Sequence, residues 1–156
     1  MAEQKPKTIA VNRKARHDYQ VFETFEAGIV LTGGEIKSVR NGRVQLRDGY
    51  AIIQNGEAWL ENVHISPYEQ AARDNPSPIR RRKLLLHRRE INRLIGKTQE
   101  KGLTLIPMEV YLSRGRAKVK LALARGRRQY DKRRAIAERE MRLEVERARK
   151  KSLGFG

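Results

Sequence analysis

The sequence LTLIPMEVYLSRGRAKVKLALA, residues 103–124, predicts the centre of the fold. Its dipeptide Arg114-Gly115 separates two apolar segments, 103–112 and 117–124, a pattern typical of an antiparallel hairpin. The return segment alternates, so that one face carries Ala117, Val119, Leu121 and Leu123. Lys118 and Lys120 are therefore expected on the opposite face.

Extended structure is also predicted upstream of this hairpin. Residues 50–54 and 58–65 flank Asn55-Gly56, a dipeptide that tolerates the positive φ angles of a tight hairpin turn. Residues 19–31 are rich in β-branched and aromatic side chains and indicate a strand pair or one bent strand, with an irregularity near Gly28. Residues 8–11 could add a short strand.

Two short helices are expected between these strands. The first covers residues 35–40, after a turn at Gly33-Gly34 and before a stop at Asn41-Gly42. The second follows the basic run 80–83 and three leucines, with His87 as its cap and Glu90 as the reciprocal partner. We expect Gly102 to end it.

These elements predict a mainly β fold with short helices (α+β). About six antiparallel strands fit a closed or nearly closed barrel, since closure removes exposed sheet edges. The sequence pattern alone does not separate such a barrel from an open α+β sheet. We expect the barrel domain to occupy residues 1–124 and a basic tail to occupy residues 125–156. The tail buries too little to fold alone, so we expect it to be disordered when free and helical when bound.

The charge of the chain points to a polyanionic partner. The sequence has 35 Lys and Arg residues against 18 Asp and Glu residues, a net charge of +17 on 156 residues. Residues 17–79 sum to −4, whereas residues 125–156 sum to +7. Charge runs are often only solvated faces. So large a clustered excess nevertheless favours nucleic-acid binding, with an anionic membrane surface as the other candidate.

Several functional classes are disfavoured by what the sequence lacks. The absence of cysteine removes disulfides, thiolate metal sites and thiol catalysis, and favours the cytoplasm. No apolar run approaches a membrane span, and residues 1–12 lack the apolar centre of a secretory signal. His17, His64 and His87 lie far apart in sequence, and no phosphate-loop or zinc motif occurs. We therefore expect no enzyme activity, no metal and no cofactor.

Particular strings carry a resemblance that composition does not. They are NRKARHDY (12–19), FEAGIVL (25–31), EIKSVR (35–40), HISPY (64–68), RKLLL (82–86), KVKL (118–121) and GRRQYDKR (126–133). Together, and in this order, they resemble the small protein B (SmpB) family of SsrA-binding proteins over nearly the whole chain. The resemblance implies an oligonucleotide/oligosaccharide-binding (OB) β-barrel that binds transfer-messenger RNA and rescues stalled ribosomes.

The resemblance also implies which residues bind RNA. Glu26, Leu85 and Lys118 match the positions that contact the transfer-RNA-like part of that RNA in the family. Weaker candidates for phosphate contact are Asn12, Arg13, Lys14, Arg16, His17, Lys37 and Lys120. The alternatives are that Asn12 caps local backbone, that Arg16 pairs with Asp18, that Leu85 is ordinary core, and that Glu26 and Lys118 are solvated surface charges.

For the tail, the resemblance implies contact with the ribosome. Its residues there are Gly126, Arg127, Arg128, Tyr130, Asp131, Lys132 and Arg133, with arginines where the family pattern has lysines. Tyr130 is implied to stack in the decoding centre, the alternative being that it packs the tail onto the barrel. The implied partners are transfer-messenger RNA, the stalled 70S ribosome with its decoding centre and empty mRNA channel, and elongation factor Tu through the shared RNA. We expect a monomer.

Two other functions stay open at this point. One is a general RNA-binding or ribosome-associated protein without specificity for transfer-messenger RNA. The other is a nucleic-acid-modifying enzyme in which Glu26 or Glu35 is an acid or base.

Overall fold

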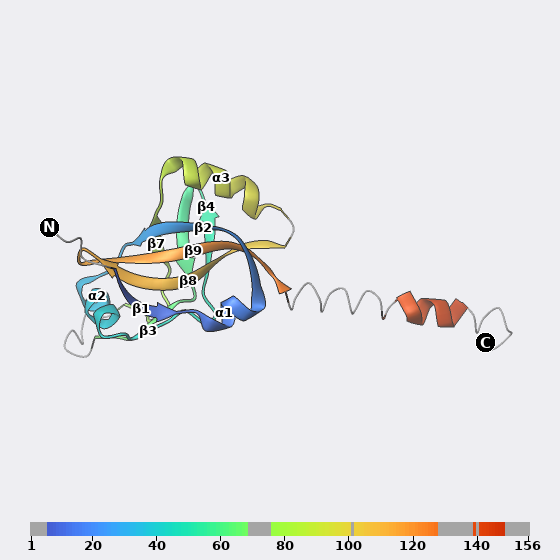
Figure 1. Ribbon diagram of the computed structural model, residues 1–156, viewed down its shortest axis with the longest axis horizontal. Helices are drawn as coiled ribbons and strands as arrows, with labels where there is room; N and C mark the ends of the chain where they lie inside the picture. The colour runs from blue at the N-terminus through green and yellow to red at the C-terminus, as the bar shows by residue number, and fades with distance from the viewer. Residues whose placement is uncertain (1–5, 69–75, 101, 128–138, 140, 149–156) are drawn as a thin grey trace.

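The computed structural model describes residues 6–68, 76–100, 102–127, 139 and 141–148. Figure 1 shows a β-barrel flanked by short helices. The elements, in chain order, are β1 (Lys7–Val11), α1 (Arg13–Asp18), β2 (Tyr19–Ile29), α2 (Gly33–Arg40), β3 (Val44–Gln45), β4 (Tyr50–Gln54), β5 (Glu57–Glu61), β6 (His64–Ile65), β7 (Arg82–Leu85), α3 (Arg88–Thr98), β8 (Leu103–Ser113) and β9 (Arg116–Gly126).

Six of the described strands close into a ring. Their order is β8-β4-β5-β7-β2-β9, and β9 pairs back with β8. All these pairings are antiparallel, β1 adds to β8 outside the ring, and β3 pairs with β6 in a small second sheet. The predicted antiparallel barrel of about six strands is confirmed, and the open α+β sheet is excluded.

Both predicted hairpins are confirmed, because their turn residues adopt the backbone that the sequence suggested. Asn55 and Gly56 have φ angles of 54° and 73° between β4 and β5, and Arg114 and Gly115 have φ angles of 53° and 75° between β8 and β9. Two successive positive φ angles define the turn whose twist matches paired strands. Residues 58–65 do not form one strand, however: Asn62, also with positive φ, separates β5 from β6.

β2 is one long strand, and its irregularity lies elsewhere than predicted. The register against β9 shifts between Val21 and Glu23, not at Gly28. At Gly28 the strand instead changes its pairing, because Gly28 is in register with both Lys118 of β9 and Leu85 of β7. This position joins two parts of the ring.

The helices begin and end where their local hydrogen bonds dictate. α2 starts at Gly33, two residues earlier than predicted, because Thr32 accepts from the Glu35 amide and Glu35 accepts from the Thr32 amide. α3 follows His87, whose amide donates to Glu90 as predicted. It ends at Thr98, before Gly102.

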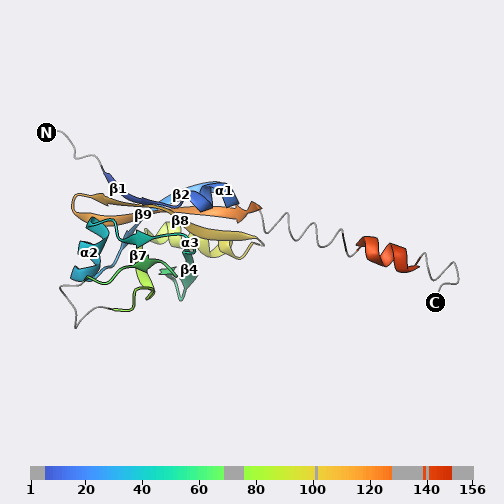
Figure 2. The same ribbon diagram turned by 90° about the horizontal axis from the view of Figure 1, so that it is seen from below.

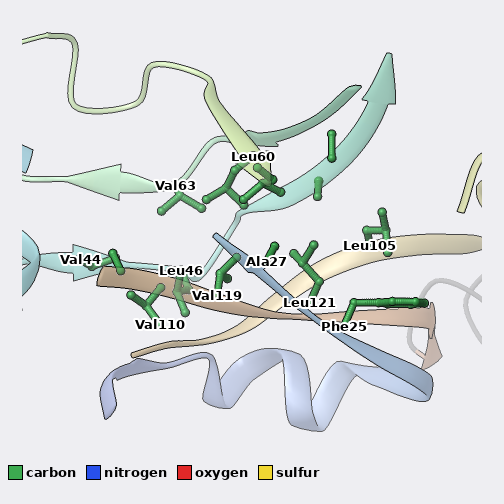
Figure 3. Close-up of a cluster of buried hydrophobic side chains, with 14 of the residues drawn as sticks. Phe25, Ala27, Val44, Leu46, Leu60, Val63, Leu105, Val110, Val119 and Leu121 are labelled. Atoms are coloured by element: carbon green, nitrogen blue, oxygen red, sulfur yellow. The ribbon is translucent and has the colours of Figure 1, made fainter. Parts of the chain in front are cut away.

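Two layers of apolar side chains hold the barrel together. The interior layer includes Phe25, Ala27, Leu60, Leu105 and Leu121, which point into the ring in Figure 3. A second, smaller cluster lies on the other face of β8 and β9, where Ala15 of α1 covers Ile106, Met108, Ala122 and Ala124. In Figure 2, α1 lies along this outer side of the barrel. The predicted basic stretch 12–17 is thus the cap residue Asn12 and most of a helix, α1.

The C-terminal part is described only in places. β9 continues through Arg125 and Gly126, two residues past the expected end of the barrel domain. Residues 141–148 are helical, and Met141 and Val145 are exposed there. The rest of the predicted tail, apart from Arg127 and residue 139, lies outside the described residues. None of the described helices is long and apolar enough to cross a membrane.

Candidate nucleic-acid interface

The three residues first singled out for RNA contact meet in one surface groove. The groove has a volume of about 630 Å³. The strands of the ring line one side of it with Glu26 and Gly28 of β2, Leu85 of β7 and Lys118 of β9. Ile36 of α2 and Thr32, the residue that caps α2, also line it. We call it the β2–α2 groove. It is assembled by the ring, which brings positions 92 residues apart, Glu26 and Lys118, into contact.

Glu26 and Lys118 form an ion pair at the edge of the β2–α2 groove. The Lys118 Nζ donates to Glu26 Oε1 at 2.6 Å, diagonally across β2 and β9. Hydrogen bonds from Lys118 and from the Tyr111 hydroxyl lower the pKa of Glu26. Because the side chains are 56% and 32% exposed, such a pair contributes at most about 1 kcal/mol and can be exchanged for another anion.

Leu85 supplies the apolar part of the β2–α2 groove. Its neighbour Leu84 is buried in the core, whereas Leu85 is 55% exposed. The alternative that Leu85 is ordinary core is therefore wrong. Leu85 lies over Gly28, where an added Cβ would be 3.4 Å from the Leu85 Cβ. A leucine that is exposed, lies over a glycine and has a cation beside it can pack against the flat face of a base or against a sugar.

A buried ion-pair network holds the two walls of the β2–α2 groove together. Glu35 of α2 is 4% exposed and Arg82 of β7 is 0% exposed. Arg82 Nε donates to Glu35 Oε2 at 2.8 Å, and its other nitrogens donate to the carbonyls of Val63, Pro78 and Arg80. Arg80 also pairs with Glu35. Arg82 therefore joins β7 to α2 and is not part of a solvated basic run.

The same network settles the ionisation of its members. Burial raises the pKa of Glu35, but hydrogen bonds from Arg80, the Thr32 amide and Arg82 outweigh burial, and the net shift is downward. Burial also lowers the pKa of Arg82. With both oxygens engaged by arginines, Glu35 is not placed to exchange protons with a substrate, which argues against its role as an acid or base.

Of the basic residues of α1, Lys14 lines a different groove. Arg13, Lys14, Arg16 and His17 are exposed, and Lys14 lies 4.0 Å from Asp48. This second groove, of about 580 Å³, is lined by Lys14, Arg47, Tyr50 and Gly126 among others. Because Gly126 ends β9, the second groove lies at the root of the tail.

Asn12 is a correction to the expected phosphate contacts. Its side chain is buried, accepts from the Ala15 amide at 3.1 Å and donates to the carbonyls of Leu46 and Pro107. The alternative, in which Asn12 caps local backbone, is the one the structure has. The side-chain NH2 group, the part of Asn12 that could donate to a phosphate, is already engaged by these two carbonyls.

The other candidate lysines differ in their surroundings. Lys37 is exposed on α2, and its Nζ lies 5.2 Å from the centre of the Tyr68 ring. Lys120 is exposed on β9 between Glu26 and Glu109 in register. It makes no ion pair within the described part of the chain: Glu26 pairs with Lys118, and Glu109 accepts a hydrogen bond from Thr8.

For the tail candidates the structure describes only the first two. Gly126 and Arg127 belong to the end of the barrel sheet and the residue after it. The other five, Arg128, Tyr130, Asp131, Lys132 and Arg133, lie outside the described residues. Within the described ranges no group of three or more His, Asp or Glu side chains could hold a metal ion.

Comparisons with known proteins single out one family. A family model described as SmpB protein matches residues 9–151. The SsrA-binding protein of Desulfitobacterium hafniense is 59% identical over 147 residues, which cover 94% of each chain. The SsrA-binding protein of Desulforudis audaxviator is 60% identical over 148 residues, which cover 95% of this chain and 97% of the relative.

A solved structure is similar as well. It is described as "tmRNA-SmpB: a journey to the center of the bacterial ribosome". One of its chains is 52% identical to this protein, with a TM-score of 0.65, and the match covers 75% of this chain and 82% of the other. At this identity the likeness extends beyond the fold to the sequence.

Proposed function

Because the chain belongs to the SmpB family, we propose that it binds the tRNA-like domain of transfer-messenger RNA (SsrA RNA) and delivers it to stalled ribosomes for trans-translation. Its partners are then transfer-messenger RNA and the 70S ribosome, with elongation factor Tu reached through the RNA. The protein acts in the cytoplasm as a monomer. It works by binding and makes or breaks no covalent bond.

One observation carries the RNA-binding part of this proposal. The exposed Leu85, resting on Gly28, lies in the same groove as the exchangeable Glu26–Lys118 pair. An apolar seat next to an exposed cation can hold an unstacked base or sugar and its phosphate together. Such sites suit a folded RNA with splayed nucleotides better than a regular duplex.

The tail has the second part of the task. We assign the tail that follows β9, residues 127–156, to the decoding centre and the empty mRNA channel, where its charge of +6 would meet ribosomal phosphates. In the helical residues 141–148, Met141 and Val145 are exposed. These side chains therefore do not have to be detached from the barrel before the helix binds the ribosome. Occupation of the channel reports that messenger RNA is missing.

A salt titration of Lys118→Ala tests the RNA contact. We expect weaker binding to transfer-messenger RNA and a salt dependence of log K that is flatter by about one unit. Lys97→Ala is the matched control, because it removes the same charge on α3, away from the β2–α2 groove, and should leave the slope unchanged. Equal slopes for Lys118→Ala and wild type would contradict a phosphate contact at Lys118.

Removal of residues 130–156 tests the division between barrel and tail. Binding to isolated transfer-messenger RNA should stay within about twofold of wild type, since the grooves lie outside the deleted segment. Rescue of stalled ribosomes in a reconstituted translation assay should be abolished. Loss of RNA binding in the truncated protein would show that the tail, not the barrel, grips the RNA.

The second candidate function is RNA binding without specificity for transfer-messenger RNA. Competition separates the two: excess bulk transfer RNA should displace labelled transfer-messenger RNA only weakly if the specific function is correct. Equal competition by both RNAs would support the general function.

A further inference from the structure

An aromatic ring is exposed near the start of β2. Phe22 is 51% exposed, whereas Phe25 on the same strand is 6% exposed and belongs to the core. The register against β9 passes directly from Val21 to Glu23, so that Phe22 is an extra residue without a partner on β9. Such a bulge changes the direction of the side chain that it carries. The fold therefore presents Phe22 to solvent instead of packing it.

An arginine lies beside this ring. The guanidinium carbon of Arg125 in β9 is 5.7 Å from the centre of the Phe22 ring, within the range of a cation–π contact. Among the described residues, no carboxylate pairs with Arg125. Glu23, the acid next to Phe22, accepts from Nε and Nη2 of Arg93 at 3.1 and 2.9 Å. The charge around the ring is therefore positive on balance.

An exposed ring with a guanidinium beside it suits an unpaired nucleotide. The face of an aromatic side chain can stack on any base, and a neighbouring arginine can bind the phosphate of the same nucleotide. A regular duplex hides the faces of its bases. The partner must therefore present an unstacked base.

The Phe22–Arg125 pair is well separated from the β2–α2 groove. Phe22 lies six residues before Gly28 on β2, which is about 20 Å of strand. Arg125 is the last residue but one of β9, whereas Lys118 lies near the other end of that strand. The pair thus lies at the end of β9 where the tail begins. If the β2–α2 groove holds transfer-messenger RNA, this end of the barrel is the one that follows the tail towards the ribosome.

We propose that the Phe22–Arg125 pair is a contact site for ribosomal RNA, in which an unpaired base stacks on Phe22 and a phosphate binds Arg125. The inference rests on the proposed function, because it requires the tail to place this end of the barrel against the ribosome. Neither residue is among the RNA-binding or tail candidates named above. With both ends occupied, the barrel bridges two RNAs.

Two binding measurements on the full-length protein test this site. Phe22→Ala, Phe22→Leu and Phe22→Trp are titrated with 70S ribosomes that carry no messenger RNA and, separately, with isolated transfer-messenger RNA. Phe22→Ala and Phe22→Leu should bind the ribosomes at least about fivefold more weakly, the lower limit for one base stacked on an aromatic ring, whereas Phe22→Trp should bind as tightly as wild type. Binding to transfer-messenger RNA should stay within about twofold, because Phe22 lies outside the β2–α2 groove.

The salt dependence of ribosome binding distinguishes the ring from the guanidinium. Arg125→Gln should weaken ribosome binding and flatten the salt dependence of log K by about one unit, because one phosphate contact is lost. Phe22→Ala should leave this slope unchanged, since it removes no charge. An unchanged slope in Arg125→Gln would contradict the phosphate contact.

Ile79→Ala is the matched control, because Ile79 is 54% exposed and lines neither groove. Unchanged ribosome affinity in Phe22→Ala, an equal loss in Ile79→Ala, or an equal loss of transfer-messenger RNA binding would overturn the proposal. Full ribosome affinity in Phe22→Leu would also overturn it, because an apolar pocket of a ribosomal protein accepts leucine whereas base stacking requires a ring. If wild-type protein failed to bind ribosomes, the proposed function would fall instead.

Discussion

Removing the Glu35 carboxylate should destabilise the barrel more than removing any exposed acid. Glu35→Ala leaves the Arg82 guanidinium, 0% exposed, with only the carbonyls of Val63, Pro78 and Arg80. Removing one partner of a buried ion pair costs about 3–5 kcal/mol, because the other charge stays buried and uncompensated. Since domains of this size are stable by about 5–15 kcal/mol, the loss is a large share of the total.

Guanidinium chloride denaturation, followed by circular dichroism, measures this loss. The midpoint should fall at an unchanged m value. Glu61→Ala is the matched control, because Glu61 pairs with Arg81 at 2.6 Å but the Arg81 side chain is 41% exposed. Its expected cost is at most about 1 kcal/mol.

A third variant separates the ion pair from its surroundings. Replacing Glu35 and Arg82 together by methionine removes both charges and keeps similar volume, and should cost less than Glu35→Ala alone. The reasoning is refuted if Glu35→Ala and Glu61→Ala lower the free energy of unfolding equally. It is also refuted if the double replacement lowers it by the sum of the losses in Glu35→Met and Arg82→Met.

Two further predictions concern acid and packing. The folded-state pKa of Glu35 lies below its unfolded value near 4.5, so its ionisation stabilises the fold above about pH 4.5 and this contribution is lost as the pH falls through the lower folded value. Unfolding followed from pH 6 to pH 2 should therefore show a shallower acid limb in Glu35→Gln than in wild type, and parallel limbs would contradict the assignment. Gly49→Ala should cost about 1–3 kcal/mol, because its Cβ would lie 2.5 Å from Val63 Cγ2. Gly33→Ala, where nothing lies within 4 Å, is the packing control; equal stability of the two variants by thermal unfolding would rule out the clash.

The barrel was predictable where a local signal specifies it. Asn55-Gly56 and Arg114-Gly115 demand positive φ angles, and those two turns set the register of four ring strands. The alternation of Ala117 to Leu123 likewise showed which face of β9 is buried. The second buried face of β8 and β9 was not predictable, because Ala122 and Ala124 are covered by Ala15, far away in sequence.

The binding surface, like the barrel, was predictable only where a local pattern specifies a residue's position. Lys118 follows from strand alternation, but Glu26 and Leu85 came only from the family resemblance. Arg82 is one of four consecutive basic residues, a pattern that suggests a solvated surface patch. Its burial depends on Glu35, and no pattern within either segment reveals that they meet.

The covering of β8 and β9 by α1 also affects the order in which the molecule can be completed. Ala15 is made early, whereas Ala122 and Ala124 are made about a hundred residues later. At typical synthesis rates of about 5–20 residues per second, the first helix waits roughly 5–20 seconds for its docking site. The apolar face of α1 therefore stays uncovered in the nascent chain until β9 has been made.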